Sequence, residues 1–310
     1  MAGASKRILI IEGWKNMKKF LLGAVGLLAL TLAGCSSNAL TTNKTSYHPT
    51  ALTAVIKGDA KTKTVNYQVD GGAKHSVKVN GGTYFFQVPA AAKQQTVKLT
   101  AGNAKKTVTV KSVTALGNYK KLAATYNQMV IGTHLPKKVQ KQLQQAQKTQ
   151  AATKKKLTAL AKTDPMAATA AAKQQQAAAK RLQAQMATAK KQAKDDLLPT
   201  TAKDGVQNLI DTKDVTVRGN VQDGKLMGLA LIVPTKQMKT KDGQKTFGTT
   251  FALLGTTLKA KPKYVINKFE KVLKDAKKNS SSTTTKTIRS NGVRFNTGFS
   301  TDHLYIYMTK

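Results

Sequence analysis

The sequence predicts a multidomain α+β protein: a small β-sandwich, a long α-helical hairpin, and then an α+β domain with an antiparallel sheet. Three observations predict this order. Residues 47–113 contain short runs of alternating apolar positions, whereas residues 117–198 consist largely of Ala, Gln, Lys and Leu. Residues 200–310 return to strand-like runs, which flank two stretches with helical spacing of their apolar residues. The spacing of apolar residues changes from the two-residue period of strands to the 3.6-residue period of helices and back, which distinguishes the three parts.

Six or seven strands are expected in residues 47–113. The candidate strands cover residues 51–57, 64–70, 76–79, 83–88, 96–100 and 107–111. Turn signals such as Asp70-Gly71-Gly72 and Asn80-Gly81-Gly82 separate them, a spacing typical of a small antiparallel sandwich. In its architecture this stretch resembles the immunoglobulin-like modules of bacterial surface proteins, although the Trp and the Cys pair of antibody domains are absent. The resemblance implies a fold and says little about function.

Residues 117–198 predict long helices, because no glycine occurs from residue 133 to 204 and strong helix formers dominate. Asp164 is suited to cap a new helix and Pro165 to occupy its first turn, so two helices are expected to form a hairpin there. A second break lies at His134-Leu135-Pro136. It either starts the first long helix or bends a shorter one that carries Leu122, Tyr126, Met129 and Val130.

The apolar stripe of the predicted hairpin is thin. Its members are Val139, Leu143, Ala146, Leu157, Leu160, Met166, Ala170, Leu182, Met186 and Ala189. A stripe this narrow favours an antiparallel coiled coil that is exposed on most of its circumference. Residues 117–198 also carry sixteen Lys or Arg and three Asp. Two interpretations remain open: a solvated helical spacer, or a basic arm that lies on a phosphate-rich polymer or a membrane.

Residues 200–310 predict the order strand, strand, helix, helix and three further strands, with the helices on one face of the sheet. The strands are expected at residues 215–221, 225–233, 284–289, 293–299 and 303–308, and the two helices around Phe247, Phe251, Leu254, Leu258 and around Val265, Phe269, Val272, Leu273. Asn291-Gly292 is a strong two-residue turn signal. The aromatic residues Phe295, Phe299, Tyr305 and Tyr307 gather here, and Tyr305 and Tyr307 share a strand face that is either ordinary surface or a binding surface.

The charge of the chain limits its partners. Its 310 residues include 52 Lys or Arg and 14 Asp or Glu, a formal net charge of +38. Only Glu12 and Glu270 are glutamates, so most basic side chains cannot be paired. A surface of this kind attracts polyanions: anionic lipid headgroups, phosphate-bearing wall polymers or nucleic acid.

The pattern of reactive residues indicates no catalytic site, metal site or cofactor. His48, His75, His134 and His303 lie in different segments, and none has a second ligand three or four residues away on a helix. Asp195-Asp196 is the one adjacent acidic pair, and neighbouring side chains at a helix end point in different directions. We therefore expect a protein that is not an enzyme.

Residues 17–35 combine a basic stub, an apolar run over residues 20–33 and the single cysteine, Cys35. The run is too short for a comfortable membrane span and favours a signal sequence. Together with Cys35, the residues Leu32, Ala33 and Gly34 resemble the lipobox of bacterial lipoproteins, in particular those of Gram-positive bacteria. The resemblance implies cleavage before Cys35 and a diacylglyceryl group on its thiol. Two or more acyl chains at one cysteine would anchor the protein stably at the extracellular face of the cell membrane.

This resemblance completes the predicted organisation: residues 1–34 are a leader and lipoprotein signal peptide, and residues 35–46 a flexible tether. We expect translation to start at Met17, where the basic stub begins. The mature chain would carry about +34, because the leader holds five Lys or Arg and one Glu.

The expected function is a non-catalytic binding or spacer role at the cell envelope. The expected partners are the membrane, through the lipid anchor, and an anionic wall polymer or anionic lipid. One alternative is a solute-binding lipoprotein of a transport system. Another is nucleic-acid binding through the helical arm, which is disfavoured because aromatic stacking residues are nearly absent where lysines are densest.

Overall fold

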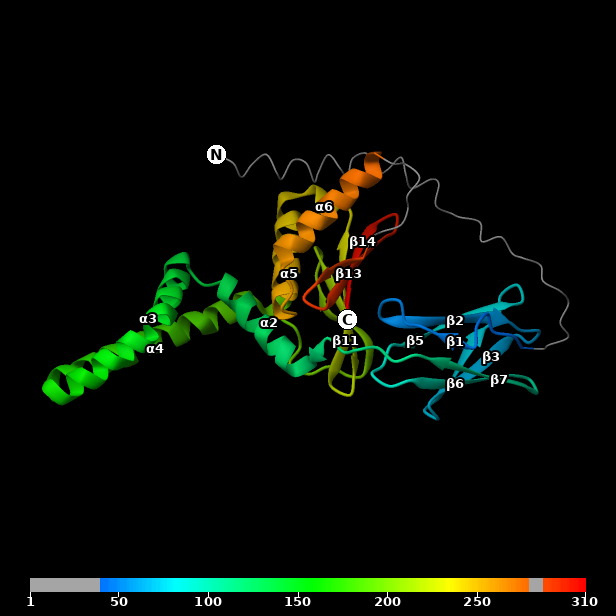
Figure 1. Cartoon of the computed structure of the whole chain (residues 1–310), viewed down its shortest axis with the longest axis horizontal. Helices are drawn as coiled ribbons and strands as arrows, with labels where there is room; N and C mark the ends of the chain where they lie inside the picture. The colour runs from blue at the N-terminus through cyan, green and yellow to red at the C-terminus, as the bar shows by residue number, and fades with distance from the viewer. Residues whose placement is uncertain (1–39, 279–286) are drawn as a thin grey trace. The chain divides into compact units, whose positions relative to one another are not determined.

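The computed structural model describes residues 40–278 and 287–310, and it has the predicted mixed α+β fold. The chain forms two compact units. One comprises the described residues up to Leu122 together with Pro199–Lys310, and the other is Ala123–Leu198. The first unit contains the sheets and the second contains the long helices (Figure 1).

The N-terminal sandwich contains seven strands. They are β1 (Ser46–Tyr47), β2 (Thr53–Asp59), β3 (Thr64–Val69), β4 (Lys74–Lys78), β5 (Thr83–Pro89), β6 (Gln95–Ala101) and β7 (Ala104–Val110). One sheet has the order β1-β7-β6-β3-β4, and the other pairs β2 with β5. All six predicted strands are confirmed to within a few residues. The prediction of a wholly antiparallel sandwich is wrong at β1, which runs parallel to β7.

Strict alternation builds the core of the sandwich. Along β2 and β5 every second side chain is buried, and the two inner faces meet in one cluster around Ile56, Tyr84 and Val97. The buried Tyr84 hydroxyl donates a hydrogen bond to the Thr41 carbonyl oxygen at 2.6 Å. Among the described residues the cluster contains neither a tryptophan nor a disulfide, and its inward positions are filled by aliphatic, tyrosine and phenylalanine side chains.

The predicted tether of residues 35–46 is wrong from Leu40 onwards. Leu40 is buried in the sandwich core, and the backbone N–H groups of Thr41 and Asn43 donate to carbonyl oxygens of β2 at 2.8 and 2.9 Å. Gly58 permits this approach, since a Cβ there would lie 2.0 Å from the Thr41 carbonyl oxygen. The segment is polar yet ordered because its backbone extends the sheet edge.

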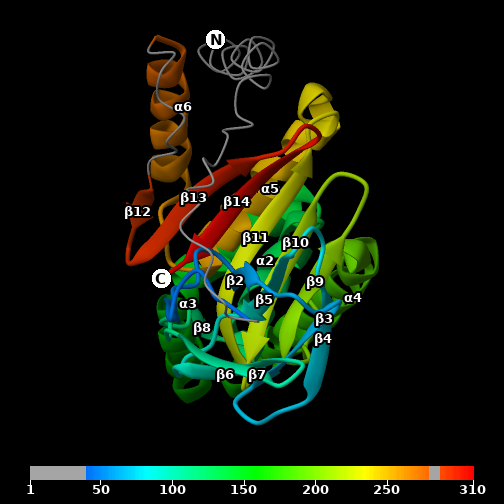
Figure 2. The same cartoon turned by 90° about the vertical axis from the view of Figure 1, so that its right-hand side faces the viewer.

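The C-terminal sheet contains seven strands. They are β8 (Gly117–Asn118), β9 (Gly205–Asp211), β10 (Thr216–Gln222), β11 (Lys225–Pro234), β12 (Ile288–Ser290), β13 (Val293–Phe299) and β14 (His303–Thr309). Six of them have the order β12-β13-β14-β11-β10-β9, with every pair antiparallel, and Figure 2 shows β13, β14, β11, β10 and β9 side by side. β8 pairs with β11 in addition. The turn residues Asn291 and Gly292 both have positive φ, as a tight hairpin requires.

Helices α5 (Lys241–Thr257) and α6 (Pro262–Lys278) cover one face of this sheet, as predicted (Figure 1). Phe251 of α5 is fully buried, and its ring centroid lies 6.0 Å from that of Phe295 on β13. The predicted aromatic cluster divides between the two faces. Phe295 points toward α5, while the half-buried Tyr305 and Tyr307 lie on the opposite face.

A buried amide joins the sandwich to the C-terminal sheet. Asn220 on β10 is fully buried, and its Nδ2 donates to the carbonyl oxygens of Leu52 and Ala90 at 2.9 and 2.7 Å. Leu52 packs on Ala230 and Ile232 of β11 beside the two tyrosines. Both buried N–H groups of Asn220 are thereby satisfied, which fixes the two parts of this unit against each other.

The helical region contains α2 (Tyr119–Thr133), α3 (Lys137–Thr163) and α4 (Pro165–Gln192), followed by the short η2 (Lys194–Asp196). The break at residues 134–136 therefore separates a shorter helix from the first long one. The predicted start of the hairpin region at residue 117 is wrong, because Gly117 and Asn118 form β8 of the C-terminal sheet. A two-residue strand has no periodicity that a sequence pattern can reveal.

Candidate functional site

The hairpin of α3 and α4, residues 137–192, is the most strongly charged region that the structure describes. We call it the basic arm. It carries thirteen Lys or Arg and one acidic residue, Asp164. All thirteen basic side chains are exposed. Within the described ranges none of them forms an ion pair, so their charge is available to an external anion.

The inner face of the basic arm is thin, as the sequence predicts. The buried contacts gather near the base, where Leu135, Val139 and Ala189 pack with the partly buried Ile131, Leu143, Leu182 and Met186. Leu157 and Leu160 toward the tip are half-buried. The predicted stripe is wrong at Ala146 and Ala170, which are exposed, and at Met166, which is 85% exposed at the start of α4. Most of the arm's surface therefore faces solvent.

Asp164 and Pro165 form the turn at the tip, as predicted. The Asp164 side chain accepts a hydrogen bond from the Ala167 N–H at 2.9 Å, and Pro165 occupies the first turn of α4. Asp164 is thus committed to the helix end, where a negative charge is favourable. Two shallow hollows flank this end of the hairpin. Lys154, Lys155 and Lys162 line the first, and Lys156 is the lysine that lines the second.

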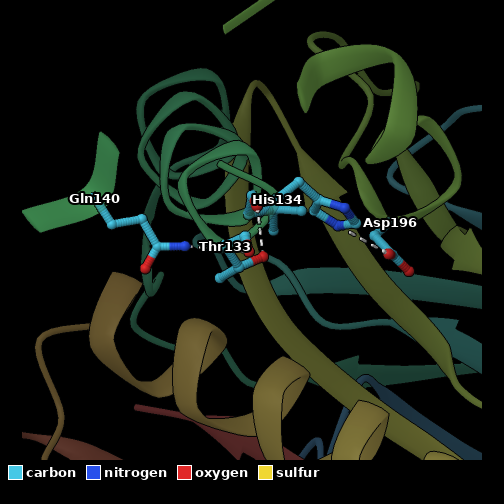
Figure 3. Close-up of polar contacts among 5 residues, drawn as sticks. Thr133, His134, Gln140 and Asp196 are labelled. Atoms are coloured by element: carbon cyan, nitrogen blue, oxygen red, sulfur yellow. Dashed lines mark hydrogen bonds and ion pairs between the residues drawn. The ribbon is translucent and has the colours of Figure 1, made fainter. Parts of the chain in front are cut away.

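The base of the arm is held by polar contacts (Figure 3). His134 lies in the turn before α3, and its Nε2 is 3.9 Å from Oδ2 of Asp196, which follows α4. Nε2 of Gln140 donates to the Leu135 carbonyl oxygen at 2.7 Å. The first contact ties the two ends of the hairpin together and accounts for His134 as a structural residue, whereas the second is local to the start of α3.

A second candidate surface is the face of the C-terminal sheet opposite α5 and α6. Strand register places Arg218, Ala230, Tyr307 and Asn296 in one row across β10, β11, β14 and β13. The ring centroids of Tyr305 and Tyr307 are 6.1 Å apart, and the rings are within 8° of parallel. We call this the tyrosine face.

A chain of hydrogen bonds orients Arg218. The Asp211 carboxylate accepts hydrogen bonds from Thr216 Oγ1 at 2.7 Å and Asn208 Nδ2 at 3.0 Å, and Asn208 Oδ1 accepts one from Arg218 Nε at 2.8 Å. These two hydrogen bonds, with a smaller contribution from the charge of Arg218, lower the pKa of Asp211. The terminal nitrogens of Arg218 make no hydrogen bond within the described part of the chain and are free to donate.

The environment of Tyr307 combines burial with a nearby cation. Burial raises the pKa of its phenol, the neighbouring Tyr305 raises it further, and the charge of Arg218 opposes both effects. In the strand register only the small Ala230 of β11 lies between Arg218 and Tyr307. The phenol of Tyr307 is therefore neutral at physiological pH and can donate a hydrogen bond.

The remaining predicted residues fall in several places. His48 and His75 are exposed, and the His75 ring stacks on Tyr67 at 5.2 Å. His303 Nδ1 lies 2.9 Å from Oδ1 of Asp302. Across residues 40–278 and 287–310, no three His, Cys, Asp or Glu residues lie together as a metal site would require.

The predicted lipidation residue Cys35 and the lipobox residues Leu32, Ala33 and Gly34 lie outside the described residues. Among the helices that the structure describes, none combines the length and apolar character of a membrane span. The predicted tyrosine pair is in place, but no sequence pattern indicated the arrangement around Arg218. A single arginine in a predicted strand has no sequence motif that indicates its partners. The contact between Arg218 and Asn208 follows only from the pairing of β10 with β9.

No family model and no curated protein matches this sequence. The geometry and charge of the basic arm and the tyrosine face are therefore the observations that bear on function.

Proposed function

We propose that this protein is a lipid-anchored lipoprotein of the bacterial cell envelope that binds anionic polymers without catalysis. Acylated Cys35 would hold it at the extracellular face of the cell membrane. The basic arm would bind phosphate groups, either on wall polymers or on anionic lipid headgroups. The observation that carries the binding proposal is the arm itself: thirteen exposed Lys or Arg, one acidic residue, and no ion pair to these bases in the described structure.

The physical basis of binding is the release of counterions from the polyanion, so added salt weakens it. An array of unpaired lysines on an extended hairpin follows a flexible polyanion over many charges, and each Lys near an anionic surface contributes about 1 kcal/mol. The narrow apolar stripe supports this interpretation, because a helix exposed on most of its circumference can present charge in several directions. No specific protein partner is implied.

The anchor is tested by cell fractionation of the wild type, Cys35→Ala and the matched control Ser36→Ala. We expect the wild type and Ser36→Ala in the membrane fraction, with the mass of an acylated N-terminal cysteine. Cys35→Ala should be released from that fraction. Equal membrane retention of Cys35→Ala, or an unmodified Cys35 in the wild type, would overturn the lipoprotein proposal.

The arm is tested with the triple variant Lys154→Gln, Lys155→Gln, Lys156→Gln. The matched control is Lys61→Gln, Lys63→Gln, Lys98→Gln, which removes three exposed lysines from the sandwich. The probes are vesicles with 30% phosphatidylglycerol, pure phosphatidylcholine vesicles, and a glycerol-phosphate polymer. The arm variant should bind the anionic probes up to about a hundredfold more weakly at low salt, with a smaller salt slope.

The probes also separate the two phosphate sources. Stronger retention on the polymer than on the anionic vesicles assigns the arm to wall polymer, and the reverse assigns it to lipid. Equal losses in the arm and sandwich variants would show that binding follows net charge alone and would refute a specific role of the arm.

A further inference from the structure

The tyrosine face carries an aromatic row along β14. His303, Tyr305 and Tyr307 project on the same side, and successive ring centroids are 6.1 Å apart. Gly298 lies opposite Tyr305 on β13, and a Cβ there would come within 3.3 Å of the Tyr307 ring. The absence of a side chain at Gly298 thus leaves room for the ring. Neither phenol oxygen has a hydrogen-bond partner in the part of the chain that the structure describes.

Two arginines flank this aromatic row. Arg218 is oriented from one side by Asn208, as described above. Arg294 lies on the other side, on β13, where Nη2 donates to the Lys310 carbonyl oxygen. The Nε atom of Arg294 is buried and has no hydrogen-bond partner in the described structure. Beside Leu52, which packs on Ala230 and Ile232, the face therefore combines two stacked tyrosine rings, their phenol groups, which are unpaired in the described structure, and the positive charges of Arg218 and Arg294.

We infer that the tyrosine face binds an acidic saccharide. The negative π face of a tyrosine attracts the axial C–H bonds of a pyranose ring, and parallel rings present such faces in sequence. The Arg218 guanidinium, whose two terminal nitrogens are unused within the described residues, suits the carboxylate of a uronic or other acidic sugar, because arginine donates two parallel hydrogen bonds to a planar anion. The phenol hydroxyls and Asn296 supply partners for sugar hydroxyl groups.

The composition of the face favours a saccharide over a polynucleotide. A single-stranded nucleic acid needs a track of cations along its backbone as well as stacking residues. The two rows that contain Tyr305 and Tyr307 include one arginine, Arg218, and no lysine. The choice of an envelope saccharide rests on the proposed extracellular location, whereas the binding measurement below does not depend on lipidation.

The test is isothermal titration calorimetry of the full-length protein, solubilised in detergent, with a hyaluronan hexasaccharide. This probe alternates N-acetylglucosamine with glucuronate. The measurement is made in 0.5 M NaCl, where long-range attraction by the basic arm is screened. We expect saturable binding, and a loss of affinity of at least about tenfold in Tyr305→Ala, Tyr307→Ala and Arg218→Gln, each of which removes one direct contact.

Matched variants separate binding from folding. Tyr264→Ala removes a 45% exposed tyrosine on α6 and should leave the affinity unchanged. Tyr305→Phe keeps the ring and should recover most of the affinity that Tyr305→Ala loses. The arm variant at Lys154, Lys155 and Lys156 should bind the hexasaccharide normally, which distinguishes failure of this site from failure of the proposed function.

Three further probes define the ligand class. Neutral hexa-N-acetylchitohexaose should bind at least about tenfold more weakly, because it offers no carboxylate to the arginines. Hexaglutamate and hexathymidylate should show no binding that depends on Tyr305 or Tyr307. Absence of hexasaccharide binding, or tyrosine-dependent binding of hexaglutamate or hexathymidylate with equal affinity, would overturn the inference.

Discussion

The C-terminal sheet and the basic arm differ in how they use apolar residues. In β11 eight consecutive residues, Leu226–Val233, are buried, because helices cover one face of the strand while Leu52 and the tyrosines pack on the other. In the 27 residues of α3 and the 28 of α4, one residue each is buried, Val139 and Ala189. The sheet is stabilised by burial. The arm depends on helix propensity and contacts at its base, which leaves its surface open for charge.

The largest expected difference between the two regions is the loss of unfolding free energy when an apolar side chain is truncated to alanine. Phe251→Ala removes a fully buried ring from the sheet and should lower the free energy of unfolding by about 3–5 kcal/mol. Leu157→Ala on the half-buried face of the arm should change it by less than about 1 kcal/mol. Urea denaturation with hydrogen exchange of each region measures both. Similar losses in the two variants would break the comparison.

The next largest effect on stability is expected at the contact between the sandwich and the C-terminal sheet. Asn220→Ala leaves the carbonyl oxygens of Leu52 and Ala90 without their buried donor, so we expect a loss of about 1–3 kcal/mol. Asn66→Ala, at an exposed position of β3, is the control and should be near neutral. Hydrogen exchange should rise on both sides of the joint. A rise limited to β10 would show that the amide does not couple the two parts.

Alkaline pH should destabilise the sheet unit through Tyr119. Its hydroxyl donates to the Pro199 carbonyl oxygen at 2.7 Å, and burial raises the pKa of Tyr119 to about 12. The folded state therefore keeps this proton more tightly than the unfolded chain, whose pKa is near 10. The contribution of this group to the free energy of unfolding is therefore complete below about pH 10. It is lost as the pH rises toward 12, by up to about 2 kcal/mol.

This pH effect is measured as the unfolding midpoint at pH 8 and pH 11. Tyr119→Phe should flatten part of the decline, and Tyr264→Phe, at an exposed position, should not. An unchanged decline in Tyr119→Phe would exclude this hydroxyl as a source of the alkaline sensitivity.

The smallest expected effect concerns the tip of the arm. Asp164→Ala removes the side chain that accepts the Ala167 N–H and should destabilise α4 by about 1 kcal/mol. Hydrogen exchange should increase in the first turns of α4 and nowhere in the sheets. Asp195→Ala is the control for the loss of one exposed carboxylate. If it produced the same local change, the cap would not be the cause.

The sequence was sufficient wherever periodicity is strong. Alternation placed β2 and β5, Asp164-Pro165 placed the tip of the arm, and Asn291-Gly292 placed a hairpin turn. The sequence pattern did not reveal β9, because the pairing register between β10 and β9 shifts at Val217 and Arg218. Leu209 and Ile210 are consequently both buried while Val206 is exposed, so β9 shows no alternation.

The candidate surfaces were predictable to different degrees. The charge of the arm is a property of composition and helix length, and both are visible in the sequence. The tyrosine face depends on pairing between strands far apart in the chain. Arg218 and Tyr307 are neighbours across Ala230 only because β10, β11 and β14 adjoin, and Asn208 joins them through β9.

The helical region of residues 120–198, which includes the basic arm, is an insertion within the C-terminal domain. Gly117 and Asn118 already belong to the sheet, and the next residue, Tyr119, is hydrogen-bonded to Pro199, where the chain returns. The polypeptide therefore leaves and re-enters the sheet unit at adjacent points. In evolution such a segment can be lengthened, shortened or replaced without altering a strand of the sheet, so homologous chains can differ in reach while the folded body stays the same.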